Sequence, residues 1–134
     1  MLLFGAMLLA GCGGPAGPPR QVVRGRITNG GEIMKHKEVL GKVEIGFRRI
    51  EQGKSDSEID INTADYNQQD GTFTVVGPDG RGIQAGKYKI SVTWKDDHPG
   101  GPDKLKDRFS EEKTKIVRDV DGAGEIVIDL AKEK

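Results

Sequence analysis

The chain has 134 residues, enough for one domain of ordinary size. Its 21 Lys and Arg residues balance 21 Asp and Glu residues, so no excess of positive charge favours a nucleic-acid partner. The 20 glycines predict many turns, and the single cysteine excludes a disulfide within the chain.

The chain begins with an apolar run over residues 2–10. This run is shorter than the about 20 apolar residues that a membrane-spanning helix needs. Its length matches the apolar part of a secretory signal, which runs to about 7–15 residues. A signal of this kind usually opens with Lys or Arg, whereas the first basic residue here is Arg20, so the true translation start is left open.

The four residues "LAGC" at positions 9–12 follow this run and resemble the lipobox of bacterial lipoproteins. The resemblance implies cleavage between Gly11 and Cys12 and attachment of a lipid to the Cys12 thiol. Acyl chains on Cys12 would hold the protein to a membrane, because each buried CH₂ contributes about 0.8 kcal/mol. Residues 1–11 are therefore predicted to be a lipoprotein signal peptide, and the partner predicted from this segment is a membrane.

A tether follows the cysteine, because residues 12–20 are rich in glycine and proline and carry no side chains that build a core. Extended at about 3.1 Å per residue, this segment would reach roughly 25 Å from the lipid. The residue after Cys12 is Gly13 and not Asp. In bacteria with two membranes, the lipoprotein resemblance therefore favours an outer-membrane location over the inner membrane within the cell envelope.

Residues 21–134 contain seven short runs in which apolar and polar side chains alternate, separated by Gly, Asn, Asp and Pro. Alternation places one buried and one solvated face on each strand. We expect one all-β domain, a seven-stranded antiparallel Greek-key β-sandwich. The runs centre on Val23–Ile27, Val43–Phe47, Ile59–Ile61, Phe73–Val75, Tyr88–Trp94, Ile116–Val117 and Ile126–Leu130.

The run "AGKYKISVTW" carries three residues predicted to specify the fold. Gly86 and Tyr88 match a tyrosine corner, in which the phenol hydrogen-bonds to the chain just upstream. Trp94 lies on the same predicted strand face as Tyr88.

The order of several short motifs resembles a known family. The motifs are "VRGRIT", "GKVEIGF", "TADYNQQDGTFTV", "AGKYKISVTW" and "GEIVIDL". Together they are similar to the carboxypeptidase regulatory-like, transthyretin-like domains of small bacterial lipoproteins. The resemblance implies that fold over about residues 22–130. A longer "GGEIMKHKEVLGK" stretch and extra residues between Asp65 and Gly71 depart from the family pattern, so loop function is the least transferable part.

The sequence holds none of the catalytic motifs that we sought, namely Gly-x-Ser-x-Gly, His-Glu-x-x-His and a P-loop. We therefore predict a protein that is not an enzyme and that has no catalytic residue, metal or cofactor. His36 and His98 are interpreted as solvated loop residues. Three acidic groups could supply oxygen ligands for calcium. Roles in turns or on the solvated surface are enough to explain the same residues, and we favour these roles. These groups are Asp56, Glu58 and Asp60; Asp65, Asn67 and Asp70; and Asp119, Asp121 and Glu125.

The longest irregular stretch covers residues 95–115, which exceeds the usual length of a loop without secondary structure. Leu105 and Phe109 are four residues apart, so a short helical turn would pin them on the sandwich. One interpretation is a crossover that covers the core, and the other is a contact surface for an envelope protein or glycan.

The sequence therefore favours a membrane-anchored, non-enzymatic structural or interaction module. The alternatives are a periplasmic small-molecule or ion-binding lipoprotein and a hydrolase of the transthyretin-like fold, since fold alone does not assign function. The oligomeric state stays open.

Overall fold

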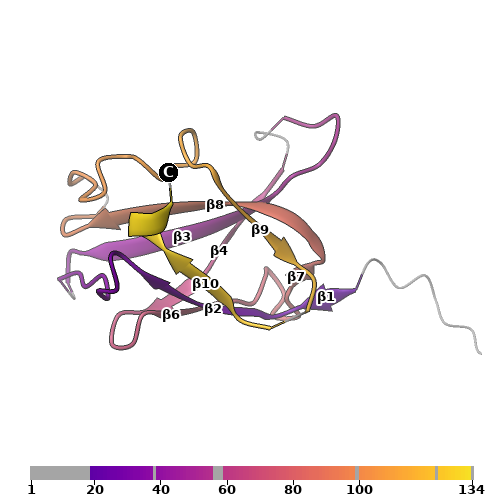
Figure 1. The fold of residues 1–134 in the computed structure, drawn as a ribbon, viewed down its shortest axis with the longest axis horizontal. Coiled ribbons are helices and arrows are strands. Elements are labelled where there is room, and N and C mark those ends of the chain that lie inside the picture. Colours follow the sequence, from indigo (N-terminus) through magenta and orange to yellow (C-terminus); the bar gives the residue numbers. More distant parts are fainter. Residues whose placement is uncertain (1–18, 38, 56–58, 99, 123, 134) are drawn as a thin grey trace, which may run out of the picture.

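A computed structural model of the chain describes residues 19–37, 39–55, 59–98, 100–122 and 124–133. Its described part is all-β, as predicted, with a single short 3₁₀ helix (Figure 1). Each of the seven predicted runs overlaps a strand. The strands are β2 (Val23–Thr28), β3 (Lys42–Arg49), β4 (Ile61–Thr63), β6 (Thr72–Val75), β8 (Gly86–Lys95), β9 (Ile116–Val120) and β10 (Ile126–Asp129).

Three further strands and the 3₁₀ helix were not predicted. They are β1 (Arg20–Gln21), β5 (Asp65–Asn67), β7 (Ile83–Gln84) and η2 (Leu130–Lys132). β1 pairs with β7 and therefore fixes the chain from Arg20 onward, inside the segment predicted to be tether.

The main strands form two four-stranded sheets, in the orders β10-β2-β6-β5 and β4-β3-β8-β9. The prediction of purely antiparallel sheets is wrong at one edge, because β10 runs parallel to β2. The chain crosses from β9 in one sheet to β10 in the other, and it arrives beside β2 in the same direction (Figure 1).

The core lies between these two sheets, as the alternation predicts. Phe47 of β3 joins them, because its ring centroid lies 5.8 Å from that of Phe73 on β6 and 6.0 Å from that of Tyr88 on β8. Burying a side chain of this size contributes about 1.5–3 kcal/mol. The most deeply buried side chains are Ile27, Met34, Ile45, Phe47, Phe73, Val75, Tyr88, Ile90, Val92, Ile116, Ile128 and Leu130.

Gly25 permits close packing at the centre of β2. It lies opposite Phe73 of β6 and Ile126 of β10 in register. A Cβ atom at this position would collide with the Phe73 ring and with the Ile126 carbonyl. Glycine is therefore required for the Phe73 ring to lie against the strand.

The residues predicted to specify the fold lie along β8. The Tyr88 hydroxyl, on a side chain that is 2% exposed, donates to the Gln84 carbonyl at 2.8 Å. Gly86 has a φ of 150°, and a Cβ there would lie 3.0 Å from Nε of Arg49. Trp94 is partly buried and packs against the core.

Some predictions concern residues outside the described ranges. These are the signal peptide, cleavage between Gly11 and Cys12, lipidation of Cys12, most of the tether, and Asp56 and Glu58 of one acidic group. In the part of the chain that the structure does describe, no helix is long and apolar enough to cross a bilayer.

Candidate functional site

Segment 95–115 is anchored by a buried carboxylate. Asp103 is 8% exposed, and its side chain accepts hydrogen bonds from the backbone N–H groups of Trp94, Leu105 and Asp107 at 2.9, 3.0 and 3.2 Å. A buried carboxylate is tolerated when several donors satisfy it. Asp103 therefore ties the start of the segment to the end of β8.

The same segment contributes two apolar side chains to the core. Leu105 is 6% exposed and Phe109 is 2% exposed. The backbone follows the edge of β8, because the Val92 N–H donates to the Phe109 carbonyl at 2.7 Å. The Thr114 hydroxyl then donates to the Ile90 carbonyl at 2.6 Å, just before β9 begins. Segment 95–115 thus covers the core beside β8, as one of the two interpretations predicted.

The short helical turn predicted to pin Leu105 and Phe109 does not form. Residues 104–109 form turns, and Lys106 and Asp107 have φ values of 55° and 58°. Positive φ values interrupt a right-handed helix. The two apolar side chains still reach the core, because turns held by Asp103 direct them inward.

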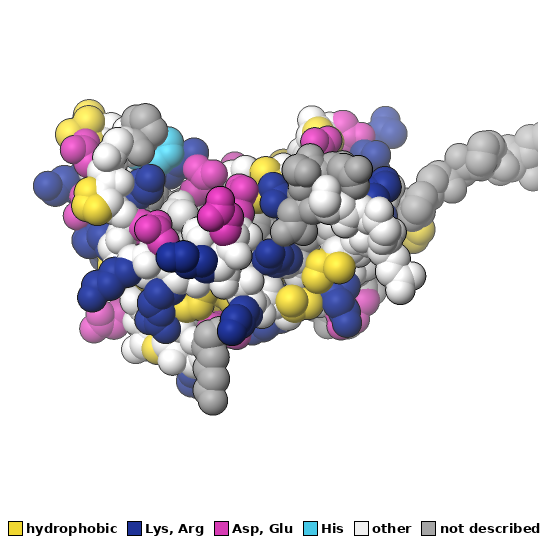
Figure 2. Space-filling model, turned by 90° about the horizontal axis from the view of Figure 1, so that it is seen from above, with side chains coloured by type: hydrophobic (Ala, Val, Ile, Leu, Met, Phe, Trp, Pro, Cys, Tyr) yellow, Lys and Arg dark blue, Asp and Glu magenta, His cyan; other side chains and the backbone are white. Residues whose placement is uncertain are grey.

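Charged side chains cover the outer side of segment 95–115. Lys104 pairs with Asp96 at 3.1 Å and lies 4.4 Å from the centroid of the Trp94 ring. Glu111 pairs with Arg48 of β3 at 3.4 Å. Basic and acidic side chains intermix on the face that Figure 2 shows. The segment therefore has a buried structural side and a charged outer side.

A second irregular segment, residues 33–41, closes the same end of the sandwich. The Tyr66 hydroxyl of β5 donates to the Met34 carbonyl at 2.6 Å, and the Trp94 indole N–H donates to the Lys35 carbonyl at 2.9 Å. Burial raises the pKa of Tyr66 to about 12. Two rings, one from each sheet, therefore hold this segment, while Val39 and Leu40 at its tip are 92% and 54% exposed.

The two histidines have separate partners. Nδ1 of His36 lies 3.1 Å from the Lys37 carbonyl, and Nε2 of His98 lies 3.9 Å from the Glu44 carboxylate. No contact between the two imidazoles is found among the described residues, so these rings do not form a common site there.

Asn67 and Asp70, from one of the acidic groups, have structural roles in their own turn. Asn67 accepts from the Gln69 N–H at 2.9 Å, and Asp70 accepts from the N–H and hydroxyl of Thr72 at 3.0 and 2.7 Å. The hydrogen bond from the Thr72 hydroxyl holds the pKa of Asp70 below its ordinary value. Within the described ranges, no three His, Cys, Asp or Glu side chains gather closely enough to hold a metal ion.

A cleft of about 320 Å³ lies where β9 ends and β10 begins, beside the start of β2. Val23, Val120 and Ile126 give it apolar walls, while Arg24 and Asp119 are among its charged lining residues. This cleft was not predicted from the sequence, because two stretches far apart in the chain, residues 21–24 and residues 119–126, build it. The acidic residues of the turn at 121–125 were its one local signal.

Comparisons of the chain with protein-family models, with curated proteins and with solved structures found no match.

Proposed function

We propose that this protein is a lipid-anchored cell-envelope module that acts by contact and not by catalysis. In this proposal Cys12 is the lipidated first residue of the mature protein, and residues 12–20 tether the domain. The outer side of segment 95–115 meets the partner. The lipobox "LAGC" after an apolar run supports the anchor.

The main support for the proposal is that segment 95–115 has buried anchoring residues on one side and exposed charged residues on the other. Asp103, Leu105, Phe109 and Thr114 fix its backbone from the buried side. The outward side chains are therefore presented on a held frame, and binding them would cost little conformational entropy. The segment begins at the end of the domain opposite β1, where the tether enters (Figure 1).

We also propose that the domain is a Greek-key sandwich of the transthyretin-like kind with seven principal strands. The hydrogen bond from Tyr88 to Gln84 supports this assignment, because it has the form of a tyrosine corner. A Cys12 anchor and a tether would then present a small sandwich near the membrane, which raises the effective concentration of an envelope partner.

Labelling cells with a palmitate analogue tests the anchor. The wild-type chain should be labelled and recovered with membranes, and the Cys12→Ala variant should be unlabelled. Equal labelling of the two chains would contradict the lipid anchor.

Pull-down from the native envelope tests the contact surface. Replacing the whole segment would also remove Leu105 and Phe109 from the core, so only outward side chains are changed. Arg108→Ala with Lys113→Ala should reduce partner recovery, and Arg81→Ala, in the turn at 78–81, is the control. Partner recovery equal to wild type in the double variant would place the contact elsewhere.

The cleft beside β2 favours a second candidate, a carrier of a small molecule or ion. Its volume suits a small ligand, at the lower end of the about 300–1,000 Å³ typical of ligand sites. A rise in melting temperature with divalent cations or small amines, abolished by Asp119→Asn, would support this alternative.

A further inference from the structure

We propose that a small monovalent anion, of the size of chloride, binds between Arg48 and Lys89 on the outer face of the sheet β4-β3-β8-β9. This inference goes beyond the proposed function, and it needs neither the Cys12 lipid nor a protein partner. The site is a small cavity lined by Arg48 of β3, Ile61 of β4, Lys89 and Ser91 of β8, and Glu111 and Thr114 of segment 95–115.

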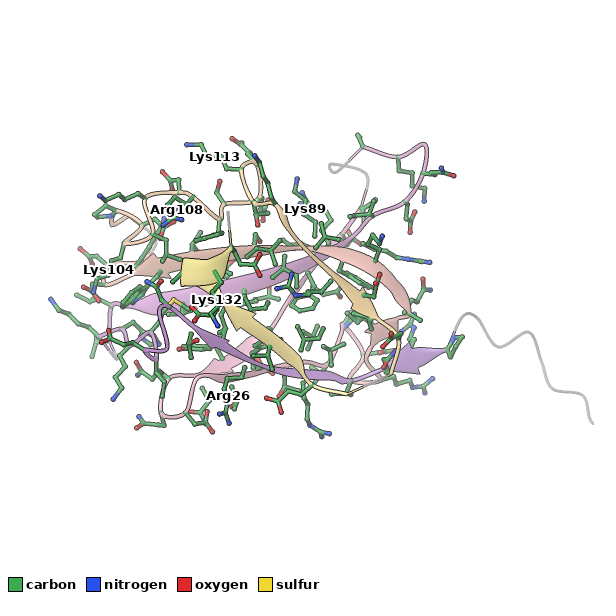
Figure 3. The ribbon with its side chains drawn as sticks, viewed as in Figure 1. Arg26, Lys89, Lys104, Arg108, Lys113 and Lys132 are labelled. Carbon is green, nitrogen blue, oxygen red and sulfur yellow. The ribbon has the colours of Figure 1, made fainter. Side chains whose placement is uncertain are left out.

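Two cations lie next to each other at this site. Arg48 and Lys89 pair in register across β3 and β8, and both side chains line the cavity. Figure 3 shows Lys89 on the upper side of the molecule, above β8 and on the same side as Lys113 of segment 95–115. Like charges directly opposite each other on one face of a sheet are destabilising. An anion between the two side chains would offset this repulsion.

The Arg48 guanidinium also has an unused hydrogen-bond donor. Its side chain is 17% exposed, and its Nε–H is buried with no acceptor among the residues that the structure describes. Its Nη2 donates to the Glu111 carboxylate at the long distance of 3.4 Å. Buried donors in folded proteins nearly always have an acceptor, which can be a bound water or ion. The Nε–H therefore indicates that the cavity holds an acceptor.

A second donor lines the same cavity. Ser91 is 8% exposed, and its hydroxyl forms no hydrogen bond with any described residue. The Thr114 hydroxyl is already used, because it donates to the Ile90 carbonyl at 2.6 Å. A guanidinium N–H, a hydroxyl and an ammonium group around one small space are donors that suit an anion.

The charge around the cavity is net positive. Among the described lining residues, Arg48 and Lys89 are cations and Glu111 is the one carboxylate. Lys89 has a further interaction, and its charge still acts at the cavity. Other charges adjoin the lining residues and balance in number, because Arg49 is paired with Glu51, and Lys87, Lys113 and Lys115 stand against Asp60, Glu112 and Asp119. One monovalent anion would neutralise the remaining positive charge.

The size of the cavity limits the ligand. Its volume is about 10 Å³, which is room for one particle of the size of a water molecule. Phosphate and organic carboxylates are too large for this space, whereas chloride is only slightly larger than water. Glu111, whose side chain is 50% exposed, can move outward to admit it. A water molecule would accept the Arg48 Nε–H but would leave the positive charge, so the charge favours an anion.

Chloride NMR on the full chain tests the inference, with sodium chloride as the probe. Exchange of chloride with a protein site broadens the chloride line, so the excess line width reports binding. The wild-type chain should give excess broadening that saturates as chloride is raised at constant ionic strength. Lys89→Gln should remove most of this broadening. Glu111→Gln should raise the affinity for chloride several-fold, because it removes the competing carboxylate.

Two matched controls separate a site from a general effect of charge. Lys87→Gln changes the preceding lysine on the same face of β8, and Glu112→Gln changes the neighbour of Glu111; neither residue lines the cavity. Both controls should bind chloride as the wild type does. A gain of affinity in Glu111→Gln cannot result from unfolding, so this arm stays informative if Lys89→Gln is unstable.

Two results would overturn the proposal. The first is a wild-type chain that gives no saturable broadening, in which case the cavity holds water alone. The second is a pair of site variants that differ from wild type no more than their controls do.

Discussion

Segments 33–41 and 95–115 are both irregular, and both meet at Trp94, but they are held in different ways. Segment 95–115 supplies its own anchors, among them Asp103 and Phe109. Apart from the buried Met34, segment 33–41 is held by side chains of other elements, because Tyr66 and Trp94 donate to its backbone carbonyls.

Because of this difference, the residues that hold segment 95–115 in place are not the residues that we propose to bind a partner. In segment 95–115 the anchoring residues point inward, so its outer residues can vary in charge while the backbone stays in place. In segment 33–41 the anchoring rings belong to β5 and β8, and losing one of them disturbs a sheet as well as the segment. The comparison predicts which substitutions change stability and which change binding alone.

The largest effect is expected at Phe109. Phe109→Ala should lower the free energy of unfolding by about 3–5 kcal/mol, because the ring is buried and its loss leaves a cavity. Urea denaturation measures this change. A loss below about 1 kcal/mol would show that the segment does not depend on its inward side.

Asp103→Ala should have the next largest effect. It leaves the backbone N–H groups of Trp94, Leu105 and Asp107 without their acceptor. The expected loss of unfolding free energy is about 2–3 kcal/mol. Asp97→Ala, an exposed neighbour, is the control and should stay within about 0.5 kcal/mol of wild type. Equal losses in the two variants would contradict the anchoring role of Asp103.

Tyr66→Phe probes the segment that is held from outside. It removes one hydrogen bond, to the Met34 carbonyl, and should lower the free energy of unfolding by about 1 kcal/mol. Hydrogen exchange of the backbone amides at 33–37 should rise in this variant more than exchange in segment 95–115. A uniform rise in both segments would show that the two are not held independently.

The same tyrosine predicts loss of stability in alkali. Burial raises the pKa of Tyr66 from 10.0 to about 12, and it also raises the pKa of Tyr88. Because the folded state favours the protonated phenol, this contribution is fully present below pH 10.0 and is lost as pH rises through about 12. Tyrosinate absorbance followed against pH, with Tyr66→Phe for assignment, checks the value. Titration of Tyr66 near its ordinary pKa would contradict its burial.

The smallest effect on stability is expected on the outer side of segment 95–115. Arg108→Ala with Lys113→Ala should change the free energy of unfolding by less than about 0.5 kcal/mol, because both side chains are exposed. Thermal denaturation gives this value, and the pull-down then reports binding by a folded variant. A large loss of stability would mean that the outer side is also structural.

Alternation along the chain was enough to predict the all-β class and the main strands, because one face of each strand is buried. It missed β1, β5 and β7, which have two or three residues each and are too short to show a period. It also missed the parallel direction of β10, which depends on the crossover from β9 and has no local signal.

The candidate site was predictable in outline from the length of segment 95–115 and from the spacing of Leu105 and Phe109. The buried role of Asp103 could not be predicted from the sequence. Its three hydrogen-bond donors are backbone N–H groups, and these converge on the carboxylate only once the turn has formed.

Photocrosslinking in intact cells tests whether the outer side of segment 95–115 is the contact surface of the anchored protein. A photoreactive residue replaces Lys113 on the outer side of segment 95–115, or Arg81 as the control, in the otherwise wild-type chain. We expect crosslinks to membrane lipid or to an envelope protein from position 113 and few from position 81. Adding Cys12→Ala should abolish the crosslinks from both positions. Equal crosslinking from the two positions, or crosslinking from position 113 that persists without Cys12, would contradict the proposal.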